Sequence, residues 1–242
     1  MRSSLFIQTR QNLLKLIKER EVVTRENQLL SEEELAHKLQ VSRTTIREVL
    51  ASLTNEGLIS KKHGLGNFVH YSALNTKMRI DQTREFLDLI EEAGYRVKSI
   101  INPESFGLHA SVEMARKLGL NPEDELFFFQ CTYQADEQPA IHCHLYISRA
   151  KLKVVPSIEM EKDIFTFLKK YADEEITHTI VWLKSKNCLP PLSDIFGIDN
   201  GTSIMFWEEM YYNLFDEIVC YAEIYFNPNV IDMSMLRKNG IY

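Results

Sequence analysis

The sequence predicts an α+β protein in two parts, a helical first part that ends in a β-hairpin and a second part built mainly on an antiparallel sheet. Two observations predict this class. Apolar residues recur at helical spacing up to about Gly57 and alternate beyond it, and the second half repeats a helix-and-hairpin pattern at a fixed offset. We expect domains at residues 1–71 and 80–242, joined by a polar linker at residues 72–79.

Three helices are expected in the first part. Apolar spacing predicts the first over about Leu5–Arg20. The second begins at Ser31, which can form a capping box with Glu34, and the third runs from a cap at Ser42 to a left-handed stop near Gly57. Only about two residues separate the second and third helices, the spacing of a helix-turn-helix.

The segment after the third helix, LISKKHGLGNFVHY, changes to the pattern of two short strands around a glycine-bearing turn. Its tip is basic and small, with Lys61, Lys62, His63 and Gly64 in succession. Three helices followed by such a hairpin predict a winged helix.

The third helix has two distinct faces. Its core face carries Ile46, Val49, Leu50 and Leu53. The other face carries Arg43, Thr44 and Arg47. Arginine can donate two hydrogen bonds to guanine, and threonine can contact a phosphate or a thymine methyl group. A solvated face with ordinary arginines is the alternative, but the basic hairpin that follows favours a helix that reads DNA.

Charge is divided unevenly between the two parts. Residues 1–71 contain 11 Lys and Arg against 8 Asp and Glu, whereas the remainder contains 17 against 26. A mildly basic first part on an acidic second part fits a first part that meets a polyanion.

Hydropathy and cysteine usage indicate a cytoplasmic protein. No apolar run approaches the roughly 18–20 residues of a membrane helix, and the start, MRSSLFIQTR, lacks the apolar segment of a signal peptide. The four cysteines show no paired spacing, which is typical of reduced thiols rather than of a disulfide framework.

The second part contains an internal repeat. MARKLGLNPEDELFFFQCTYQ and LSDIFGIDNGTSIMFWEEMYY align with an offset of 78 residues, and each continues into a returning strand, HCHLYIS or YAEIYFN. Two similar helix-plus-hairpin halves are therefore expected, in a mainly antiparallel sheet.

The first part resembles the winged helix of the GntR family of bacterial transcription regulators, with VSRTTIRE, NEGLI and the HGxGxFV wing as the distinctive motifs. The resemblance implies that Arg43 and Arg47 face the groove of operator DNA. Backbone contacts are implied for Ser42, Thr44 and Thr45, and a minor-groove position for the wing tip at His63 and Gly64, beside Lys61 and Lys62. Where the family usually has arginine before the apolar run of the second helix, this chain has Glu33, which we leave out of the DNA-binding set.

The second part resembles the UTRA effector-binding domain of the HutC branch of that family, which is similar in fold to chorismate lyase. The LGL-x-P turn, the D-E-Q-P hairpin turn and the tyrosine ending each repeat carry this resemblance. It implies an antiparallel sheet with flanking helices, a homodimer formed through this domain, and a small-molecule pocket between its halves.

The pocket positions differ from those of the sugar-phosphate-sensing members. An Arg-x-Arg pair in those members corresponds to Cys131 and Tyr133 here, and their two glutamates correspond to Cys143 and Cys220. The candidate effector-binding set is Cys131, Tyr133, Cys143, Asp163, Phe165, Cys220, Glu223 and Phe226. These residues favour a lipophilic, aromatic or cationic effector rather than a sugar phosphate, unless they only pack as core.

The same residues are compatible with three other functions. A metal- or thiol-sensing regulator would use Cys131, Cys143 and Cys220, but strand alternation should turn His142 and His144 away from Cys143. An enzyme like chorismate lyase has only fold similarity in its favour, and we assign no catalytic residue, metal or cofactor. A plain DNA-architectural protein would leave the second part without a role. We therefore expect a ligand-responsive repressor released from its operator by a small molecule.

Overall fold

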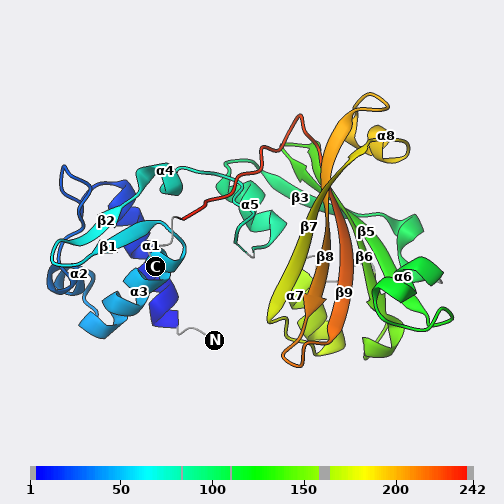
Figure 1. Ribbon diagram of the computed structural model, residues 1–242, viewed down its shortest axis with the longest axis horizontal. Coiled ribbons are helices and arrows are strands. Elements are labelled where there is room, and N and C mark those ends of the chain that lie inside the picture. The colour runs from blue at the N-terminus through cyan, green and yellow to red at the C-terminus, as the bar shows by residue number, and fades with distance from the viewer. Residues whose placement is uncertain (1–3, 83, 110, 158–163, 239–242) are drawn as a thin grey trace. The chain divides into compact units, whose positions relative to one another are not determined.

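The computed structural model describes residues 4–82, 84–109, 111–157 and 164–238, and divides into two compact units (Figure 1). The first unit comprises Met1–Gln82 together with Ser234–Tyr242, and the second comprises Thr83–Met233. The predicted α+β class is confirmed. These units differ from the predicted domains in two ways. The predicted linker at residues 72–79 belongs to the first unit, and the chain returns to that unit after Met233.

The first unit is a winged helix. Its elements are α1 (Ser4–Lys18), α2 (Glu32–Leu39), α3 (Arg43–Asn55), β1 (Ile59–Lys62), β2 (Gly66–Val69) and α4 (Tyr71–Leu74). The capping box is present, since the Ser31 side chain accepts from the Glu34 amide and the Glu34 carboxylate accepts from the Ser31 amide at 2.8 Å. The predicted stop at Gly57 lies in the left-handed region, at φ 73°.

One apolar core joins the helices to the wing. Leu13 and Ile17 of α1, Leu35 of α2 and Ile46 and Leu53 of α3 are fully buried together. Full burial of each such side chain contributes roughly 1.5–3 kcal/mol relative to exposure. This core fixes the angle of α3 and leaves its other face in solvent.

The second unit is a seven-stranded antiparallel sheet. Its strands are β3 (Val97–Ile101), β4 (Gly107–His109), β5 (Leu126–Ala135), β6 (Gln138–Ser148), β7 (His178–Asn187), β8 (Ser203–Tyr212) and β9 (Ile218–Phe226). The order is β3-β5-β6-β9-β8-β7, and β4 also pairs with β5.

The strand order reproduces the internal repeat. The first copy supplies α6 (Val112–Lys117), β5 and β6, and the second supplies α8 (Leu192–Phe196), β8 and β9. The copies join where β6 pairs with β9 at the centre of the sheet (Figure 1). The predicted helix-plus-hairpin halves are thus observed.

Short helices complete the second unit. They are α5 (Phe86–Glu92), η1 (Pro103–Ser105), η2 (Arg149–Lys151), α7 (Ile164–Phe167) and η3 (Leu168–Ala172). Phe86 of α5 packs against Tyr133 and Phe226, and Phe167 of α7 packs against Phe127. We call the sheet face that these two helices contact the inner face.

Candidate nucleic-acid interface and effector site

The N-terminal half of α3 presents polar groups to solvent. Ser42, Arg43, Thr44 and Arg47 are exposed, and Thr45 is half-buried. The Ser42 hydroxyl accepts a hydrogen bond from the Thr45 amide at 3.1 Å, which caps the helix. The residues predicted to contact DNA therefore lie on one outward surface, opposite the core face of the helix.

Both arginines of this surface are paired with carboxylates of α2. Arg47 Nε donates to Glu32 Oε2 at 2.5 Å, and Arg43 lies 4.0 Å from Glu33. The hydrogen bond from Arg47 holds the pKa of the Glu32 carboxyl below its usual range. Since the arginine side chains are 57–61% exposed, these pairs are weak and can be exchanged for another anion.

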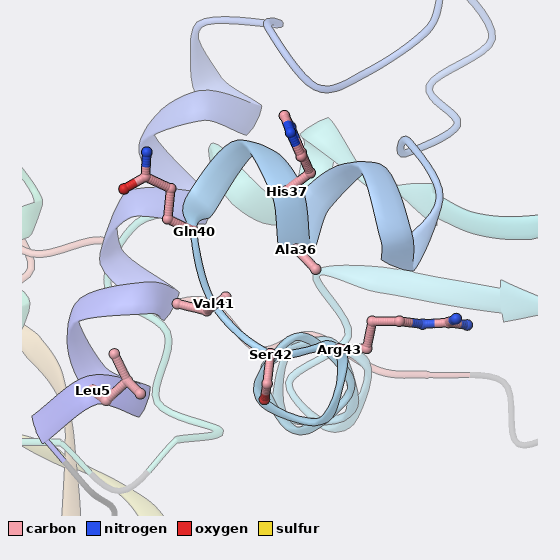
Figure 2. Close-up of a pocket in the computed structure, with 7 residues that line it drawn as sticks. All are labelled: Leu5, Ala36, His37, Gln40, Val41, Ser42 and Arg43. Carbon is pink, nitrogen blue, oxygen red and sulfur yellow. The ribbon is translucent and has the colours of Figure 1, made fainter.

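Two surface hollows border α3, one at its first turn and one along its middle and last turns. One, of about 590 Å³, is lined by Leu5, Ala36, His37, Gln40, Val41, Ser42 and Arg43 (Figure 2). The other, of about 390 Å³, is lined by Glu32, Arg47, Leu50, Ala51, Thr54, Asn55, Lys61 and Asn67. The second hollow connects the exposed face of α3 with the wing.

The wing carries its basic residues on β1 rather than at its tip. Lys61 and Lys62 are exposed strand residues, and Lys62 pairs with Gly66. Residues 63–65 form the turn, where Gly64 adopts φ 74° with no atom within 4 Å of an added Cβ. Such an open, left-handed position suits close approach to another surface.

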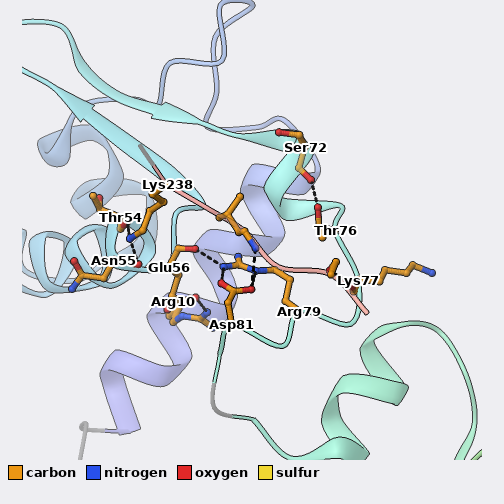
Figure 3. A network of polar contacts seen from close by, with 12 residues as sticks. Arg10, Thr54, Asn55, Glu56, Ser72, Thr76, Lys77, Arg79, Asp81 and Lys238 are labelled. Atoms are coloured by element: carbon orange, nitrogen blue, oxygen red, sulfur yellow. Dashed lines mark hydrogen bonds and ion pairs between the residues drawn. The ribbon is translucent and has the colours of Figure 1, made fainter. Parts of the chain in front are cut away.

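The far end of α3 is held by a polar network (Figure 3). Arg79, 7% exposed, donates to the Glu56 carbonyl at 2.9 Å and pairs with Asp81 at 2.5 Å. The Glu56 carboxylate accepts from Arg10 of α1 at 2.6 Å. A buried arginine thus connects the residue that caps α3 with the segment leading out of the first unit.

The returning C-terminal segment joins this network. Ser234 forms a parallel bridge with Arg79, and the Leu236 amide donates to Asp81 at 3.2 Å. Lys238 Nζ donates to the Thr54 carbonyl and, more closely, to the next carbonyl along α3. A cation at the C-terminal end of a helix is favourable because the helix dipole is negative there. No sequence pattern pointed to this return.

The inner face of the sheet gathers most of the predicted effector-binding residues. Cys131 and Cys143 are direct cross-strand partners, while Tyr133 and Phe226 both flank Ile141. Cys220 shares the face, paired with Ile147, and Phe165 of α7 contacts Tyr211. Asp163 lies outside the described residues.

Glu223 does not belong to this set. Strand alternation places it on the outer face, opposite Cys220 and Phe226. There it accepts hydrogen bonds from Tyr225 at 2.8 Å and Tyr221 at 3.1 Å. Despite burial, hydrogen bonds from His144 and Tyr225 and the nearby Lys117 lower the pKa of the Glu223 carboxyl to about 2. Glu223 therefore lies apart from the other described residues of the predicted set.

Three inner-face residues were missed by the sequence analysis: Trp207, Glu209 and Tyr211. The internal repeat could have identified two of them. With its offset of 78 residues, Glu209 is the counterpart of Cys131 and Tyr211 is the counterpart of Tyr133. Glu209 is a buried carboxylate, 7% exposed.

The cysteines and histidines do not form a metal site in the described part of the chain. No group of three His, Cys, Asp or Glu side chains there is arranged to hold an ion. Cys220 lies away from the Cys131–Cys143 pair, and His142 and His144 contact each other on the outer face. Burial raises the pKa of the Cys143 and Cys220 thiols, which keeps them protonated and poorly reactive. None of the described helices is long and apolar enough to cross a membrane.

Comparison with known proteins places both units. Residues 8–69 match the family model "Bacterial regulatory proteins, gntR family", and residues 105–232 match the UTRA domain, which alone covers more than half of the chain. The architecture is that of a bacterial regulatory protein with an effector-binding domain. The chain belongs to the gntR family and carries a UTRA domain.

Relatives of this chain agree with that assignment. It is 29% identical over 135 residues to the HTH-type transcriptional regulator YurK of Bacillus subtilis. The aligned region covers 56% of this chain and 54% of YurK. The chain thus spans about half the length of this curated relative. Its fold matches YydK from Bacillus subtilis with a TM-score of 0.79 at 16% identity, over 98% of this chain and all of that one. PhnF from Mycobacterium smegmatis matches with a TM-score of 0.60 at 14% identity, over 96% and 100%.

Proposed function

We propose that this chain is a sequence-specific DNA-binding transcription regulator, a repressor released from its operator by a small-molecule effector. The observation that carries the proposal is the outward surface of α3, where Arg43 and Arg47 are exposed while the opposite face is locked into the core. Membership of a family of regulatory proteins supports this role over that of an enzyme or a metal sensor.

In the proposed complex, α3 enters the major groove with its N-terminal turn foremost. Arg43 leaves Glu33, Arg47 leaves Glu32, and both arginines then hydrogen-bond to base edges. Contacts with the sugar-phosphate backbone come from Ser42, Thr44 and Thr45. Lys61 and Lys62 contact phosphates, and the tip at His63 and Gly64 lies in the minor groove. The weak pairing of both arginines in the DNA-free protein allows this exchange at small cost.

Selection from a random duplex library tests DNA reading. The full chain should enrich one two-fold-symmetric site, with half-sites about one helical turn, ~34 Å, apart or a modest multiple of that. Lys62→Ala should weaken binding to all sequences alike, whereas Arg116→Ala, an exposed arginine of the second unit, should change nothing. Failure of the full chain to enrich any sequence would refute the proposal.

We also propose that the regulator is a homodimer joined through β7. This edge strand exposes four consecutive apolar residues, Ile180, Val181, Trp182 and Leu183, each 39–48% exposed. An unpaired apolar edge strand is a template for another strand. A second copy of β7 fits it, because antiparallel pairing about Trp182 sets Lys184 opposite Ile180, so that no lysine faces another lysine.

Sedimentation velocity tests this interface. Trp182→Glu should convert the dimer to a monomer at micromolar concentration. Leu214→Glu, at an apolar residue that is 78% exposed outside the strand, should leave the dimer intact. A monomeric parent protein, or a dimer unaffected by Trp182→Glu, would exclude β7 as the contact.

The effector is proposed to bind the inner face of the sheet, among Cys131, Tyr133, Cys143, Phe165, Cys220 and Phe226. A phosphorylated sugar brings about two negative charges, whose burial requires charged donors. Cys131 and Tyr133 are not such donors. Glucosamine 6-phosphate should therefore neither raise the melting temperature nor release DNA. Micromolar stabilisation that is abolished by Tyr133→Ala would overturn this part of the proposal.

A further inference from the structure

Glu209 is a buried carboxylate that the predicted effector set does not explain. It lies on the inner face of β8, opposite Val181 of β7 and Ala222 of β9, and is 7% exposed. Among the described residues, no lysine, arginine or histidine forms an ion pair with it. Burying a charge without a partner is costly, so such a group is rarely kept for stability alone.

The polar groups around Glu209 carry no positive charge. Burial raises the pKa of its carboxyl, although hydrogen bonds from Thr179 and Tyr211 act in the opposite direction. The indole nitrogen of Trp207 lies on the same face and is buried, yet it has no hydrogen-bond partner of good geometry among the described residues. A buried donor without a partner thus lies on the same face as a buried carboxylate whose hydrogen-bond donors are all neutral.

Aromatic rings surround these two groups. Phe86 of α5 lies 5.8 Å from the Trp207 ring and 5.6 Å from Tyr133, and Trp207 lies 4.7 Å from Phe226. Phe165 covers Tyr211 at 6.0 Å. Aromatic faces with one carboxylate are the recognition chemistry of organic ammonium ions, because ring quadrupoles and the carboxylate both attract positive charge.

We propose that the effector is a small organic cation, an ammonium group on an apolar or aromatic body, and that Glu209 is its counter-ion. The Trp207 indole N–H donates to an acceptor on the ligand, and Phe86 and Phe165 cover its apolar part. This inference rests on the proposed function, since it names the ligand class of the effector site.

Matched ligand triads test the inference on the full-length protein without DNA. Each triad shares one apolar body and carries an ammonium, an alcohol or a carboxylate: phenethylamine, 2-phenylethanol and phenylacetate, with the same series on benzyl, indolylethyl, cyclohexylmethyl and hexyl bodies. Thermal shift and titration calorimetry measure binding to the parent protein and to Glu209→Gln.

The expected result is that at least one ammonium compound binds the parent protein more tightly than its alcohol and its carboxylate. Glu209→Gln should weaken that compound roughly 10- to 100-fold, the loss expected of a charged hydrogen bond, and leave the alcohol unaffected. Glu208→Gln, at an outer-face carboxylate paired with Lys117 and Lys184, is the matched control and should bind like the parent.

A second readout separates ligand binding from a structural role. Because a buried carboxylate without a cation destabilises the empty protein, Glu209→Gln should raise the melting temperature without ligand. A lower melting temperature of the empty variant, or no ammonium compound preferred in any triad, would overturn the inference. Neither outcome bears on the proposed DNA binding. That proposal fails separately, if the full chain enriches no DNA sequence.

Discussion

Two glutamates, one in each unit, lie in opposite environments. Glu32 in the first unit is paired with Arg47 at 2.5 Å, and this hydrogen bond lowers the pKa of its carboxyl. Glu209 in the second unit is buried without a cation among the described residues, and burial raises the pKa of its carboxyl.

The difference matches the ligand that we propose for each unit. At the surface, the carboxylate pairs with an arginine that we propose binds DNA, and exposure to water makes the exchange of partners inexpensive. On the inner face, the carboxylate has no such partner, and a cationic ligand would supply one. The first unit therefore suits a polyanion and the second a small cation.

The largest effect is expected at Arg79, the buried arginine of the first unit. Arg79→Ala removes a buried guanidinium together with its hydrogen bond to the Glu56 carbonyl, so it should destabilise the first unit by about 3 kcal/mol. Arg84→Ala, at an arginine paired with the largely exposed Glu92, should cost about 1 kcal/mol or less. Urea unfolding measures both, and equal losses would contradict the buried network.

Removal of the recognition arginines comes next. Arg43→Ala and Arg47→Ala should each weaken binding to the selected DNA by about 1–3 kcal/mol and relax base preference at one position. Fluorescence anisotropy with single-base variants of the site measures this. If both variants footprint like the parent protein, α3 is not the reading helix.

The pH dependence of stability sharpens the comparison further. The folded-state pKa of Glu209 is raised above its ordinary value of 4.5, so its stabilising contribution is present below pH 4.5 and is lost as pH rises through the folded pKa. The stability of Glu209→Gln relative to the parent should therefore rise with pH above 4.5.

Glu223 should behave with the opposite sign. Its folded-state pKa of about 2 lies below the ordinary value of 4.5. The ionised carboxylate therefore stabilises the fold above pH 4.5, and this contribution is lost as pH falls toward 2. Chemical denaturation of the parent, Glu209→Gln and Glu223→Gln across this range measures both trends. Parallel pH profiles for the two variants would show that the two sheet faces do not differ as described.

The smallest effect is expected from Glu33, which lies 4.0 Å from Arg43 and is highly exposed. Glu33→Arg removes a negative charge facing DNA and adds a cation, so the slope of log affinity against log salt should steepen by ~0.9 for each added phosphate contact. The gain at physiological salt should stay below about 1 kcal/mol. An unchanged slope would place Glu33 away from DNA.

Most of the first unit was predictable because its signals are local. The capping box at Ser31, the cap at Ser42 and the stop at Gly57 each depend on residues a few positions apart. The return of Ser234–Lys238 was not predictable, since it depends on a contact with residues more than 150 positions away.

The inner face was only partly predictable. The strands and their repeat were predictable from residue spacing. Strand alternation, which placed His142 and Cys143 on opposite faces of the sheet, would also have placed Glu223 and Cys220 on opposite faces. Applying the repeat offset to the site itself would have revealed Glu209. Its burial could not be read from sequence, because it depends on how α5 and α7 cover the sheet.

The two chain crossings between the units offer a route for control. The chain leaves the first unit after Gln82 and re-enters it at Ser234, where Arg79 and Ser234 are bridged beside the end of α3. We propose that ligand binding in the second unit acts on α3 through this bridge, since a ligand shifts DNA affinity only by favouring one of two arrangements.

DNA affinity measured with and without a bound cation tests the central claim most directly. The selected DNA is titrated with the full chain, alone and saturated with the ammonium compound that most stabilises it. We predict that the compound weakens DNA binding by the parent protein, by roughly 5- to 150-fold for coupling of typical size, and leaves Glu209→Gln unaffected. An unchanged DNA affinity of the saturated parent protein would contradict the account.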